Sequence, residues 1–365
     1  MKVAFLSFDF GEYCIRLANA LASKEEVLLL LPDNQVQPRL ALLNQTTNLF
    51  TFRHPRLRQP LQQMQLVFSL LRHIKAWNPD VIHFQHRHLW FNFALPLLRR
   101  YPLVLTVHDP TPHVGDLESQ KCPQAVMNFG FRRAAQLIVH GEQLKHVVVN
   151  QLHIPAEIVH VIPHVVIGNE MPPQEITQDE QLVLFFGRIW EYKGLEYLIR
   201  AEPLITAQVP GARIMIAGEG EDFARYRRMM VNPEHFIVLN EYVSDEQRDE
   251  LFRRCSIVAL PYIDASQSGV IPLAYTSSKP VVATTVGGLP EMVEDGRTGY
   301  LVPPRDEKAL ADAIVRLLQN QDLCRQMGTN GKRKLDSECS EEVVAQKTLA
   351  VYARALNGVK GIAVS

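Results

Sequence analysis

Long apolar runs are missing from this sequence, because no stretch approaches the roughly 18 uninterrupted apolar residues of a membrane-spanning helix. The first residues, MKVAFLSFDFGE, are unlike a signal peptide, since their apolar run is short and is followed by Asp9 and Glu12. The five cysteines include no CxxC pair, which predicts reduced, packed thiols rather than a disulfide framework. We therefore expect a globular cytoplasmic protein without a transmembrane segment.

Acidic residues are scarce in part of the N-terminal half. Between Asp33 and Asp109, Asp80 is the only acid among nine arginines and lysines. Residues 1–165 hold 16 Lys and Arg against 11 Asp and Glu, whereas the remainder holds 22 against 28. A basic half suits an anionic partner such as a lipid phosphate or the inner face of a membrane, but a solvated basic face explains it equally well.

The usual patterns of dinucleotide and metal sites are also missing. No GxGxxG follows the first apolar run, which disfavours a nicotinamide dehydrogenase. His83, His86 and His88 in IHFQHRHLW lie along a strand end and loop, a spacing that does not orient them together on one metal ion. We expect these histidines to pack in the protein or to line a binding cleft, and we expect no metal site.

The sequence does contain a regular alternation of short apolar runs and helix-length amphipathic segments. Continuous apolar runs are typical of buried parallel strands, and the segments between them are typical of crossover helices. The alternation stops at the polar residues 168–181, interpreted as a linker, and then starts again. A chain of 365 residues is long enough for two domains, so the sequence predicts two Rossmann-like, doubly wound α/β domains.

The expected strands are Val3–Phe8, Val27–Leu31, Leu49–Phe52, Val81–Phe84, Leu103–Val107, Leu137–Val139, His160–Ile162, Leu182–Phe186, Arg213–Ala217, Phe236–Leu239, Ile257–Leu260, Val281–Thr284 and Gly299–Val302. The expected helices include Glu12–Ala22, Leu61–Trp77, Glu307–Gln319, Leu323–Leu335 and Glu341–Leu356.

The segment FGRIWEYKG directly follows one of these strands. The strand ends at Gly187 and a helix begins near Gly194, so Arg188 and Lys193 lie in a loop at the carboxyl end of a strand. Open α/β sheets bind ligands at this edge, and two cations beside a helix N-terminus suit a diphosphate. The alternative is that Arg188 and Lys193 are ordinary loop charges.

Two other segments place glycines after strands. Gly218 and Gly220 belong to IAGEGE, and Gly287 and Gly288 belong to VGGLPE. Glycine lets the chain turn tightly beside a ligand, but each segment is equally typical of a plain turn between a strand and a helix.

The segment PYIDASQSGVIPLAY combines small hydroxyl residues, a glycine and a carboxylate after a strand. A helix is expected to open near Ser268 and Gly269, where backbone N–H groups would face an anion. Asp264 in the preceding loop would accept hydrogen bonds from ligand hydroxyls. The alternative is an Asx-turn that leads into a Ser-capped helix.

Six motifs of the C-terminal half together resemble the family 4 retaining glycosyltransferases of GT-B fold. FGRxxxxKGLxxLI, IAGEGE, PYxxASQSGVxPLAY, KPVVAT, VGGLPE and DGxTGxLVPP follow one another in that family's order and spacing from about residue 182 to residue 304. The resemblance implies that Arg188 and Lys193 hold the diphosphate of a nucleotide-sugar donor. The donor-binding residues expected in this half are Gly187, Arg188, Lys193, Gly218, Glu219, Asp264, Ser266, Gln267, Ser268, Gly269 and Val270.

The resemblance also assigns parts of the donor to these residues. Gly218 and Glu219 would line the wall that binds the base, and the backbone of Gly269 and Val270 would contact the phosphate and the sugar. The family commonly has a Glu-x7-Glu element here, whose first Glu contacts the hexose and whose second holds the ribose. This chain has Asp264 and Leu273 at those places and follows the SQSGVxPLAY variant, so the nucleotide cannot be assigned by analogy.

The N-terminal half resembles the family more weakly. His108 in TVHD aligns with the histidine near the transferred sugar, where a neutral ring would bond a donor hydroxyl and hold developing charge. The alternative is a structural histidine. Asp109 would orient His108 or cap the next segment, and Gly11 in the first loop would approach the donor phosphate or the acceptor. His164 replaces the asparagine of the family's hinge turn, so we interpret it as hinge structure.

Residues 53–77 combine Arg53, Arg56 and Arg58 with an amphipathic helix. Such a segment could rest on an anionic membrane or bind a lipid-pyrophosphate acceptor. The alternative is a crossover helix packed on the sheet.

The resemblance implies an enzyme with two domains that face each other across a cleft. Residues 1–167 would bind the acceptor, residues 168–340 would bind the donor, and a last helix at about residues 341–358 would pack back on the first domain. No nucleic acid is expected as a partner.

The implied reaction moves a hexose from a UDP- or GDP-linked donor to a glycan, lipid-linked or small-molecule acceptor, with retention of configuration. Arg188 and Lys193 would stabilise the leaving diphosphate in place of a metal ion, and His108 and Asp264 would act at the sugar. No cofactor is expected. The alternatives are a non-catalytic sugar-nucleotide-binding protein, for which Leu273 argues, and a sugar-nucleotide epimerase.

Overall fold

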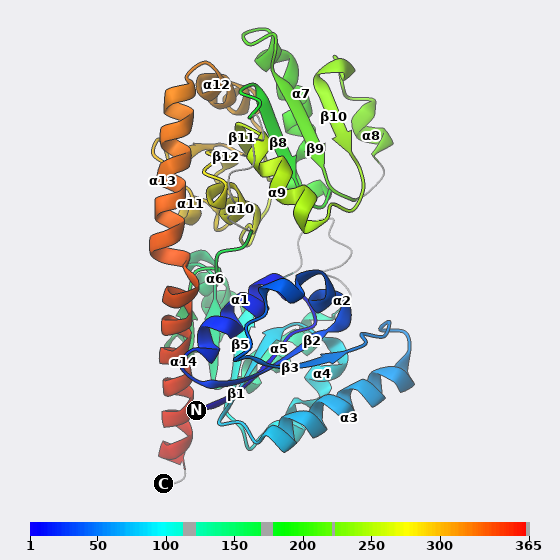
Figure 1. The fold of residues 1–365 in the computed structure, drawn as a ribbon, viewed down its shortest axis with the longest axis vertical. Helices are drawn as coiled ribbons and strands as arrows, with labels where there is room; N and C mark the ends of the chain where they lie inside the picture. Colours follow the sequence, from blue (N-terminus) through cyan, green and yellow to red (C-terminus); the bar gives the residue numbers. More distant parts are fainter. Residues whose placement is uncertain (112–121, 169–177, 221–222, 363–365) are drawn as a thin grey trace. The chain divides into compact units, whose positions relative to one another are not determined.

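The computed structural model describes residues 1–111, 122–168, 178–220 and 223–362. This part of the chain divides into two compact units (Figure 1). The first contains residues 1–111, 122–165 and 338–362, and the second contains residues 166–168, 178–220 and 223–337. Most of the segment interpreted as a linker, residues 169–177, lies outside the described residues.

The first unit is built on a parallel sheet of seven strands in the order β3-β2-β1-β4-β5-β6-β7. The apolar runs expected to be strands are strands of this sheet, and most of them are buried because helices cover its faces, whereas the edge strand Asn48–Phe52 is largely exposed or half-buried. The strands are β1 (Lys2–Leu6), β2 (Glu26–Pro32), β3 (Asn48–Phe52), β4 (Val81–His86), β5 (Leu103–Val107), β6 (Gln136–Val139) and β7 (Val159–Val161). The first strand is shorter than expected, since Ser7 turns the chain by bonding Asp9.

Helices of the first unit are α1 (Gly11–Ala22), α2 (Asp33–Val36), α3 (Pro60–Trp77), α4 (Leu89–Ala94), α5 (Gln124–Arg133), α6 (Glu142–His146) and α14 (Glu341–Ile362), with the short turns η1 (Gln37–Leu42), η2 (Leu95–Leu98), η4 (Val147–Gln151) and η5 (Ala156–Ile158). The terminal helix α14 packs on α1, β4, β5 and β6. An ion-pair network connects α1 to α14, because Arg16 of α1 contacts Glu12 of the same helix at 3.0 Å and Glu341 of α14 at 2.8 Å.

The second unit has a parallel sheet of six strands in the order β10-β9-β8-β11-β12-β13. Its strands are β8 (Leu182–Phe186), β9 (Arg213–Ala217), β10 (Phe236–Leu239), β11 (Ile257–Leu260), β12 (Val281–Thr284) and β13 (Gly299–Val302), each with the bounds expected from its apolar run. Its helices are α7 (Leu195–Thr206), α8 (Ala224–Arg227), α9 (Asp245–Arg254), α10 (Val270–Thr276), α11 (Leu289–Met292), α12 (Glu307–Leu318) and α13 (Gln321–Cys339), with turns η6 (Glu191–Lys193) and η7 (Pro233–His235).

Both sheets reverse their strand order at one point, between β1 and β4 in the first unit and between β8 and β11 in the second. Doubly wound sheets bind ligands beyond the carboxyl ends of the strands at this switch point. In the second unit, the loops at the switch point are the segments after β8 and β11, which carry Arg188, Lys193 and Asp264. The topology therefore brings the two richest motifs to one edge.

The cysteines agree with a further expectation. Cys14, Cys122, Cys255 and Cys324 are buried, Cys339 is half-buried, and none of the five forms a disulfide, as expected for packed thiols. Over the described ranges, no helix is both long enough and apolar enough to cross a membrane.

Candidate functional site

The loop after β8 depends on glycine at both of its ends. Gly187 has φ of 111° and Gly194 has φ of 64°, values that favour glycine. A Cβ on Gly194 would lie 1.9 Å from the carbonyl oxygen of Pro261, so no side chain fits where this loop approaches the loop after β11. The single turn η6 between the glycines ends at Lys193, and α7 starts directly after Gly194.

Lys193 is held by a residue that was not singled out from the sequence. Its Nζ donates to the hydroxyl of Tyr262 at 2.6 Å and lies 4.2 Å from the centre of that ring. Tyr262 is 1% exposed, and its hydroxyl lies 3.4 Å from the Ser268 hydroxyl. Burial raises the pKa of Tyr262, and nearby Arg188 opposes that shift, so the phenol is neutral and can accept from the ammonium.

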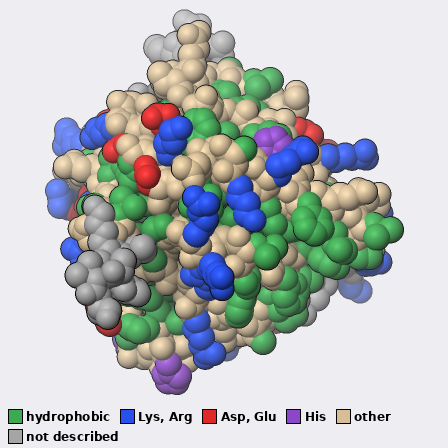
Figure 2. All heavy atoms as spheres, turned by 90° about the horizontal axis from the view of Figure 1, so that it is seen from below, with side chains coloured by type: hydrophobic (Ala, Val, Ile, Leu, Met, Phe, Trp, Pro, Cys, Tyr) green, Lys and Arg blue, Asp and Glu red, His purple; other side chains and the backbone are tan. Residues whose placement is uncertain are grey.

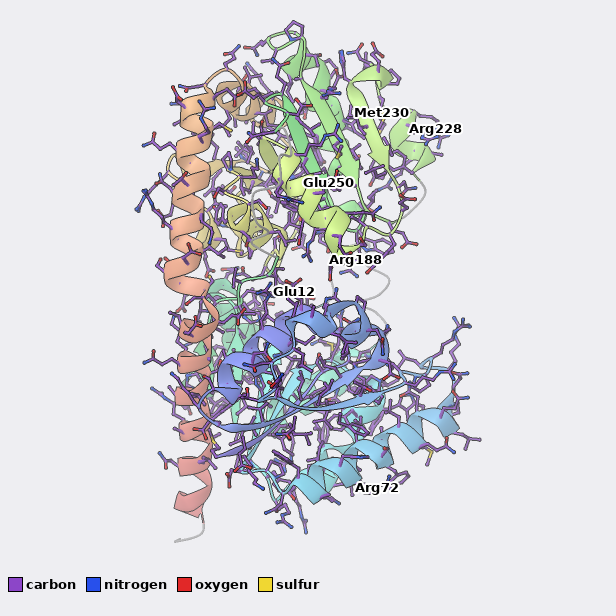
Figure 3. The ribbon with its side chains drawn as sticks, viewed as in Figure 1. Glu12, Arg72, Arg188, Arg228, Met230 and Glu250 are labelled. Carbon is purple, nitrogen blue, oxygen red and sulfur yellow. The ribbon has the colours of Figure 1, made fainter. Side chains whose placement is uncertain are left out.

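Arg188 is exposed at the end of the second sheet (Figure 3). Within the ranges that the structure describes, no hydrogen bond or ion pair engages its guanidinium group. A Cβ on Gly187, the residue directly before Arg188, would lie 4.0 Å from the Lys193 Nζ, so the two cations lie at the same end of this loop. A guanidinium and an ammonium presented together suit a ligand with two phosphate groups.

The remaining glycines let the other motifs approach these loops. Gly218 has φ of 139°, and a Cβ there would lie 2.1 Å from the Gly187 carbonyl oxygen. A Cβ on Gly287 would lie 1.6 Å from the carbonyl oxygen of Ala265. Close approach to another backbone segment is thus the local role of Gly218 and Gly287, and their approach to a ligand stays a prediction. Glu219, after Gly218, is exposed, and its carbonyl accepts from the Ile189 N–H at 2.9 Å.

The segment from Asp264 to Val270 lies partly within the protein. Ser266 and Ser268 are buried, Asp264 and Gln267 are half-buried, and Gly269 is exposed. The backbone N–H of Val270 donates to the Ser268 hydroxyl at 3.3 Å. This bond differs from the expectation of an open N–H at the helix start, because the serine two residues earlier already satisfies it.

Leu273 is buried in α10 and faces inward. It is 7% exposed, and one of its methyl groups would lie 3.1 Å from a Cβ on Gly168. Thr276, one turn later, donates to the carbonyl of Ile167 at 2.9 Å. Leu273 therefore packs α10 against residues 166–168 and presents no acceptor to a ligand.

We expect Tyr262→Phe to lower kcat/KM for the glycosyl transfer that the resemblance implies roughly tenfold, because loss of one charge-assisted hydrogen bond of about 1.5 kcal/mol frees the Lys193 ammonium to leave its position. The fold should persist, since phenylalanine keeps the ring in the core. Tyr192→Phe is the matched control, because the Tyr192 ring lies 5.5 Å from the same Nζ. Equal rates for wild type and Tyr262→Phe would contradict a positioning role.

In the first unit, His108 follows β5 and is held by Gln85 and Phe10. Its Nε2 donates to the side-chain oxygen of Gln85 at 2.7 Å, and its ring stacks on Phe10 at 4.0 Å. Burial, followed by the fields of His140 and His164, holds the pKa of His108 well below its usual range. The ring is neutral at physiological pH, as its suggested role at a sugar hydroxyl requires.

Two more histidines, His140 and His164, lie beside His108. Ring centres are 4.7 Å apart for His108 and His140, and 5.2 Å apart for His140 and His164. His140 is not among the residues expected from the sequence, and His164 was expected to be part of the hinge. The missed signal is one histidine just after each of three apolar runs, in LTVH, LIVH and VIPH.

Gly11 has a clear local role in the structure. Its N–H donates to the side-chain oxygen of Gln35 at 3.0 Å, and a Cβ would lie 2.6 Å from the Gln35 carbonyl oxygen. This N–H is therefore engaged within the protein, and contact between Gly11 and a substrate stays a prediction.

His83 and His88 of IHFQHRHLW pack within the first unit, as one of the two expectations had it, and the side chain of His86 lies outside the described part of the structure. His83 is buried, stacks on Phe5 and bonds Thr106 and Tyr352 at 2.7 and 2.6 Å. His88 stacks on Phe8 and accepts from a backbone N–H at the start of α4.

Comparison with known proteins gives matches to both halves. Residues 180–320 match the family described as Glycosyl transferases group 1, and residues 11–167 match the family described as Glycosyltransferase Family 4. The uncharacterized glycosyltransferase MJ1607 of Methanocaldococcus jannaschii is 27% identical over 298 residues, which cover 75% of each chain. A D-inositol 3-phosphate glycosyltransferase of Nocardioides sp. is 28% identical over 312 residues, 76% of this chain and 67% of that protein.

Solved structures share the fold. Anabaena Alr3699/HepE in complex with UDP and glucose has a TM-score of 0.74 at 20% identity, with 97% of this chain and 99% of that chain covered. Sucrose-phosphate synthase from Thermosynechococcus elongatus has a TM-score of 0.75 at 18% identity, with 98% and 100% covered. The two sheets are those of the GT-B fold, and the chain belongs to the group 1, or family 4, glycosyltransferases.

Proposed function

We propose that this glycosyltransferase moves a hexose from a UDP- or GDP-linked donor to a glycan, lipid-linked or small-molecule acceptor, with retention of configuration. The observation that carries the proposal is the pair of cations at the switch point of the second sheet, Arg188 and a Lys193 fixed on Tyr262. The family match supports the reaction class, and a solved structure of the same fold contains UDP and glucose.

The proposed mechanism stabilises the leaving diphosphate. Negative charge gathers on the diphosphate as the glycosidic bond breaks, and Arg188 and Lys193 neutralise it from fixed positions. Gly187 and Gly218 keep the backbone close to the donor, and Glu219 lines the wall that binds the base of the nucleotide. Asp264 and neutral His108 act at the sugar hydroxyls. Ser266, Gln267, Ser268, Gly269 and Val270 complete the donor site, and the first unit binds the acceptor.

The two cations take the place of a divalent metal ion in this proposal. We expect the rate of nucleotide diphosphate release from the donor, in the presence of acceptor, to stay within about twofold after EDTA treatment. The measurement uses lipid and glycan fractions as acceptors and detects both UDP or GDP and the glycosylated product. A strong loss that added Mg²⁺ or Mn²⁺ restores would contradict metal independence.

The same assay distinguishes two other functions. Leu273 is a buried residue of α10, and its side chain has no hydrogen-bond acceptor for a ribose hydroxyl. This difference from the family pattern favours a protein that binds a sugar nucleotide without consuming it. Donor that binds and is never consumed with any acceptor fraction would support that function. Conversion of the donor to its epimer without transfer would support an epimerase.

We further propose that α3 rests on an anionic membrane surface and brings the enzyme to a lipid-linked acceptor. Leu61, Met64 and Phe68 of α3 are 75%, 46% and 59% exposed, and they recur at helical spacing. Figure 2 shows hydrophobic side chains gathered beside Lys and Arg on the face that carries α3. Arg72, which is labelled in Figure 3, and Lys75 on the same helix supply positive charge.

We expect Arg72→Gln with Lys75→Gln to weaken binding to phosphatidylglycerol-containing vesicles roughly 30-fold, at about 1 kcal/mol for each cation. Co-sedimentation with vesicles measures the effect, and pure phosphatidylcholine vesicles should bind the wild type weakly. The matched control, Arg227→Gln with Arg228→Gln, removes two cations from the second unit. Equal sedimentation of all variants, or none for the wild type, would contradict membrane docking.

A further inference from the structure

The segment between β3 and α3, residues 53–59, forms a basic strap along the carboxyl edge of the first sheet. It leaves the sheet at the edge strand β3 and reaches the ends of β1 and β4. Ring contacts show this, because His54 of the strap lies 5.3 Å from Phe8, after β1, and 5.3 Å from His88, after β4. The ends of β1 and β4 form the switch point, where doubly wound sheets bind ligands.

Hydrogen bonds from two helices hold the backbone of the strap. Trp90 of α4 donates its indole N–H to the carbonyl of Leu57 at 3.2 Å. The buried side chain of Gln63 in α3 donates to the carbonyl of Pro55 at 2.8 Å. Because two carbonyls are bonded in this way, the strap keeps a fixed path past the switch point.

The strap carries positive charge that the protein leaves unpaired. Arg53, Arg56 and Arg58 are exposed, and the strap itself contains no acid. Across the residues that the structure describes, no hydrogen bond or ion pair engages these three guanidinium groups. Asp9, after β1, is an acid that acts on His54, so the arginines outnumber it. An excess of cations at a ligand-binding edge attracts an anion.

His88 carries a buried hydrogen-bond donor without an acceptor in the described part of the chain. Its Nδ1 accepts from the backbone N–H of Phe91 at 3.2 Å, so in the neutral ring Nε2 carries the hydrogen. Burial, followed by the effect of His54, lowers the pKa of His88 to about 3, so the ring is neutral. The side chain is 5% exposed, and Nε2 has no partner among the described residues. An acceptor oxygen brought by a ligand would remove the cost of this unpaired donor.

The neighbours of His88 fix its ring and leave an approach to it. Phe8 stacks on the ring with centres 3.7 Å apart, which holds the ring plane and the direction of the Nε2–H. His54 is exposed, and within the described ranges no hydrogen bond holds its ring, so it is free to move aside for a ligand. A neutral hydroxyl would satisfy Nε2 alone, whereas a phosphate group has oxygens for Nε2 and for the arginines together.

We infer that the strap and His88 bind a phosphate or pyrophosphate group of the acceptor. All of these residues belong to the first unit. The inference rests on the proposed function, in which this unit binds the acceptor, and it names the class of acceptor as a phosphate ester rather than a neutral glycan. The phosphate oxygens accept from His88 Nε2 and pair with the strap arginines. A lipid phosphate and a soluble sugar phosphate present the same group.

His88→Asn separates binding from structure at the buried donor. Asparagine is a good N-cap residue, so it keeps an acceptor for the Phe91 N–H and removes the Nε2–H. Lost stacking on Phe8 should lower the melting temperature whether or not a ligand binds. A histidine with a structural role alone would therefore change the melting temperature and leave the affinity for phosphate groups unchanged.

A triple variant removes the charge of the strap, and a second triple variant is its matched control. The strap variant combines Arg53→Gln, Arg56→Gln and Arg58→Gln. The control removes three cations of the same unit that precede β5 or β6, at the opposite edge of the sheet, and combines Arg99→Gln, Arg100→Gln and Arg132→Gln.

Calorimetric titration with pyrophosphate tests the site. Each variant is combined with Arg188→Ala and Lys193→Ala, so that the cations of the second unit do not bind the probe. Pyrophosphate should bind this background, roughly 30-fold more weakly with the strap variant and roughly tenfold more weakly with His88→Asn, and within about twofold of the background with the control. No binding to the background, or equal binding to all four proteins, would overturn the site.

Transfer assays on the otherwise wild-type chain separate the two sources of phosphate. Transfer to a lipid fraction that the strap variant loses and the control keeps assigns a lipid phosphate. The same result with a water-soluble fraction assigns a soluble sugar phosphate. Transfer that the strap variant retains in both fractions would overturn the inference and leave the proposed function intact. Absence of transfer to every fraction by the wild type would instead overturn the proposed function.

Discussion

Alanine at Arg188 or at Lys193 is expected to lower kcat/KM for glycosyl transfer by about 10²- to 10³-fold, with the melting temperature unchanged. Removing one positively charged side chain that stabilises a developing anion typically has an effect of this size, because water molecules are not already oriented to stabilise that charge. The exposed Arg188 supports no packing, so its loss should not disturb the fold. Lys193 is half-buried and reaches the buried Tyr262 hydroxyl through the end of its side chain, so its truncation removes no part of the apolar core.

Two other cations of the second unit are suitable controls. Arg200, on α7, is half exposed, and Lys308, on α12, is exposed. Arg200→Ala and Lys308→Ala should each transfer sugar at nearly the wild-type rate, since their charges are outside the loops after β8 and β11. Steady-state rates with the donor identified by binding provide the measurement. Wild-type rates in Arg188→Ala and Lys193→Ala would contradict the proposed mechanism.

Gly218→Ala is expected to abolish donor binding and to reduce the free energy of unfolding by more than about 2 kcal/mol. The new Cβ would lie 2.1 Å from the Gly187 carbonyl oxygen, and φ of 139° is unfavourable for alanine. The chain must move at Gly187, directly before Arg188, so the donor site changes together with the stability.

Gly296→Ala provides a control for the backbone angle alone. Gly296 also has a positive φ, 72°, but a Cβ there meets nothing within 4 Å. We expect a loss of only about 1 kcal/mol and unchanged donor binding. Urea denaturation and titration of the donor measure both effects, and equal behaviour of the two alanine variants would contradict the role of close approach at Gly218.

The strands were predictable because both sheets are covered by helices. A strand buried on both faces appears in the sequence as a continuous apolar run, and all six strands of the second sheet have the expected bounds. Helix ends were less predictable. The helix expected at 323–335 runs from Gln321 to Cys339, because no glycine or proline interrupts the chain where its apolar face begins and ends.

The site was predictable where one short segment carries the chemistry. The loop from Gly187 to Gly194 has its cations and glycines together in the sequence, so the positions of Arg188 and Lys193 followed from strand-end topology. The bond between Lys193 and Tyr262 spans 69 residues, and periodicity gives no sign of it. The contact of His108 with His140 likewise depends on which strands are neighbours, a property of the folded sheet.

The central claim is that Arg188 and Lys193 of the second unit hold the diphosphate of a nucleotide-sugar donor. The most direct measurement is the shift in melting temperature with UDP, GDP and ADP, their monophosphates and their sugars, for wild type and for the double variant Arg188→Ala with Lys193→Ala. One nucleotide diphosphate and its sugar should raise the wild-type melting temperature more than the monophosphate does, and the double variant should lose this gain. No shift with any diphosphate, or the same shift in the double variant, would contradict the account.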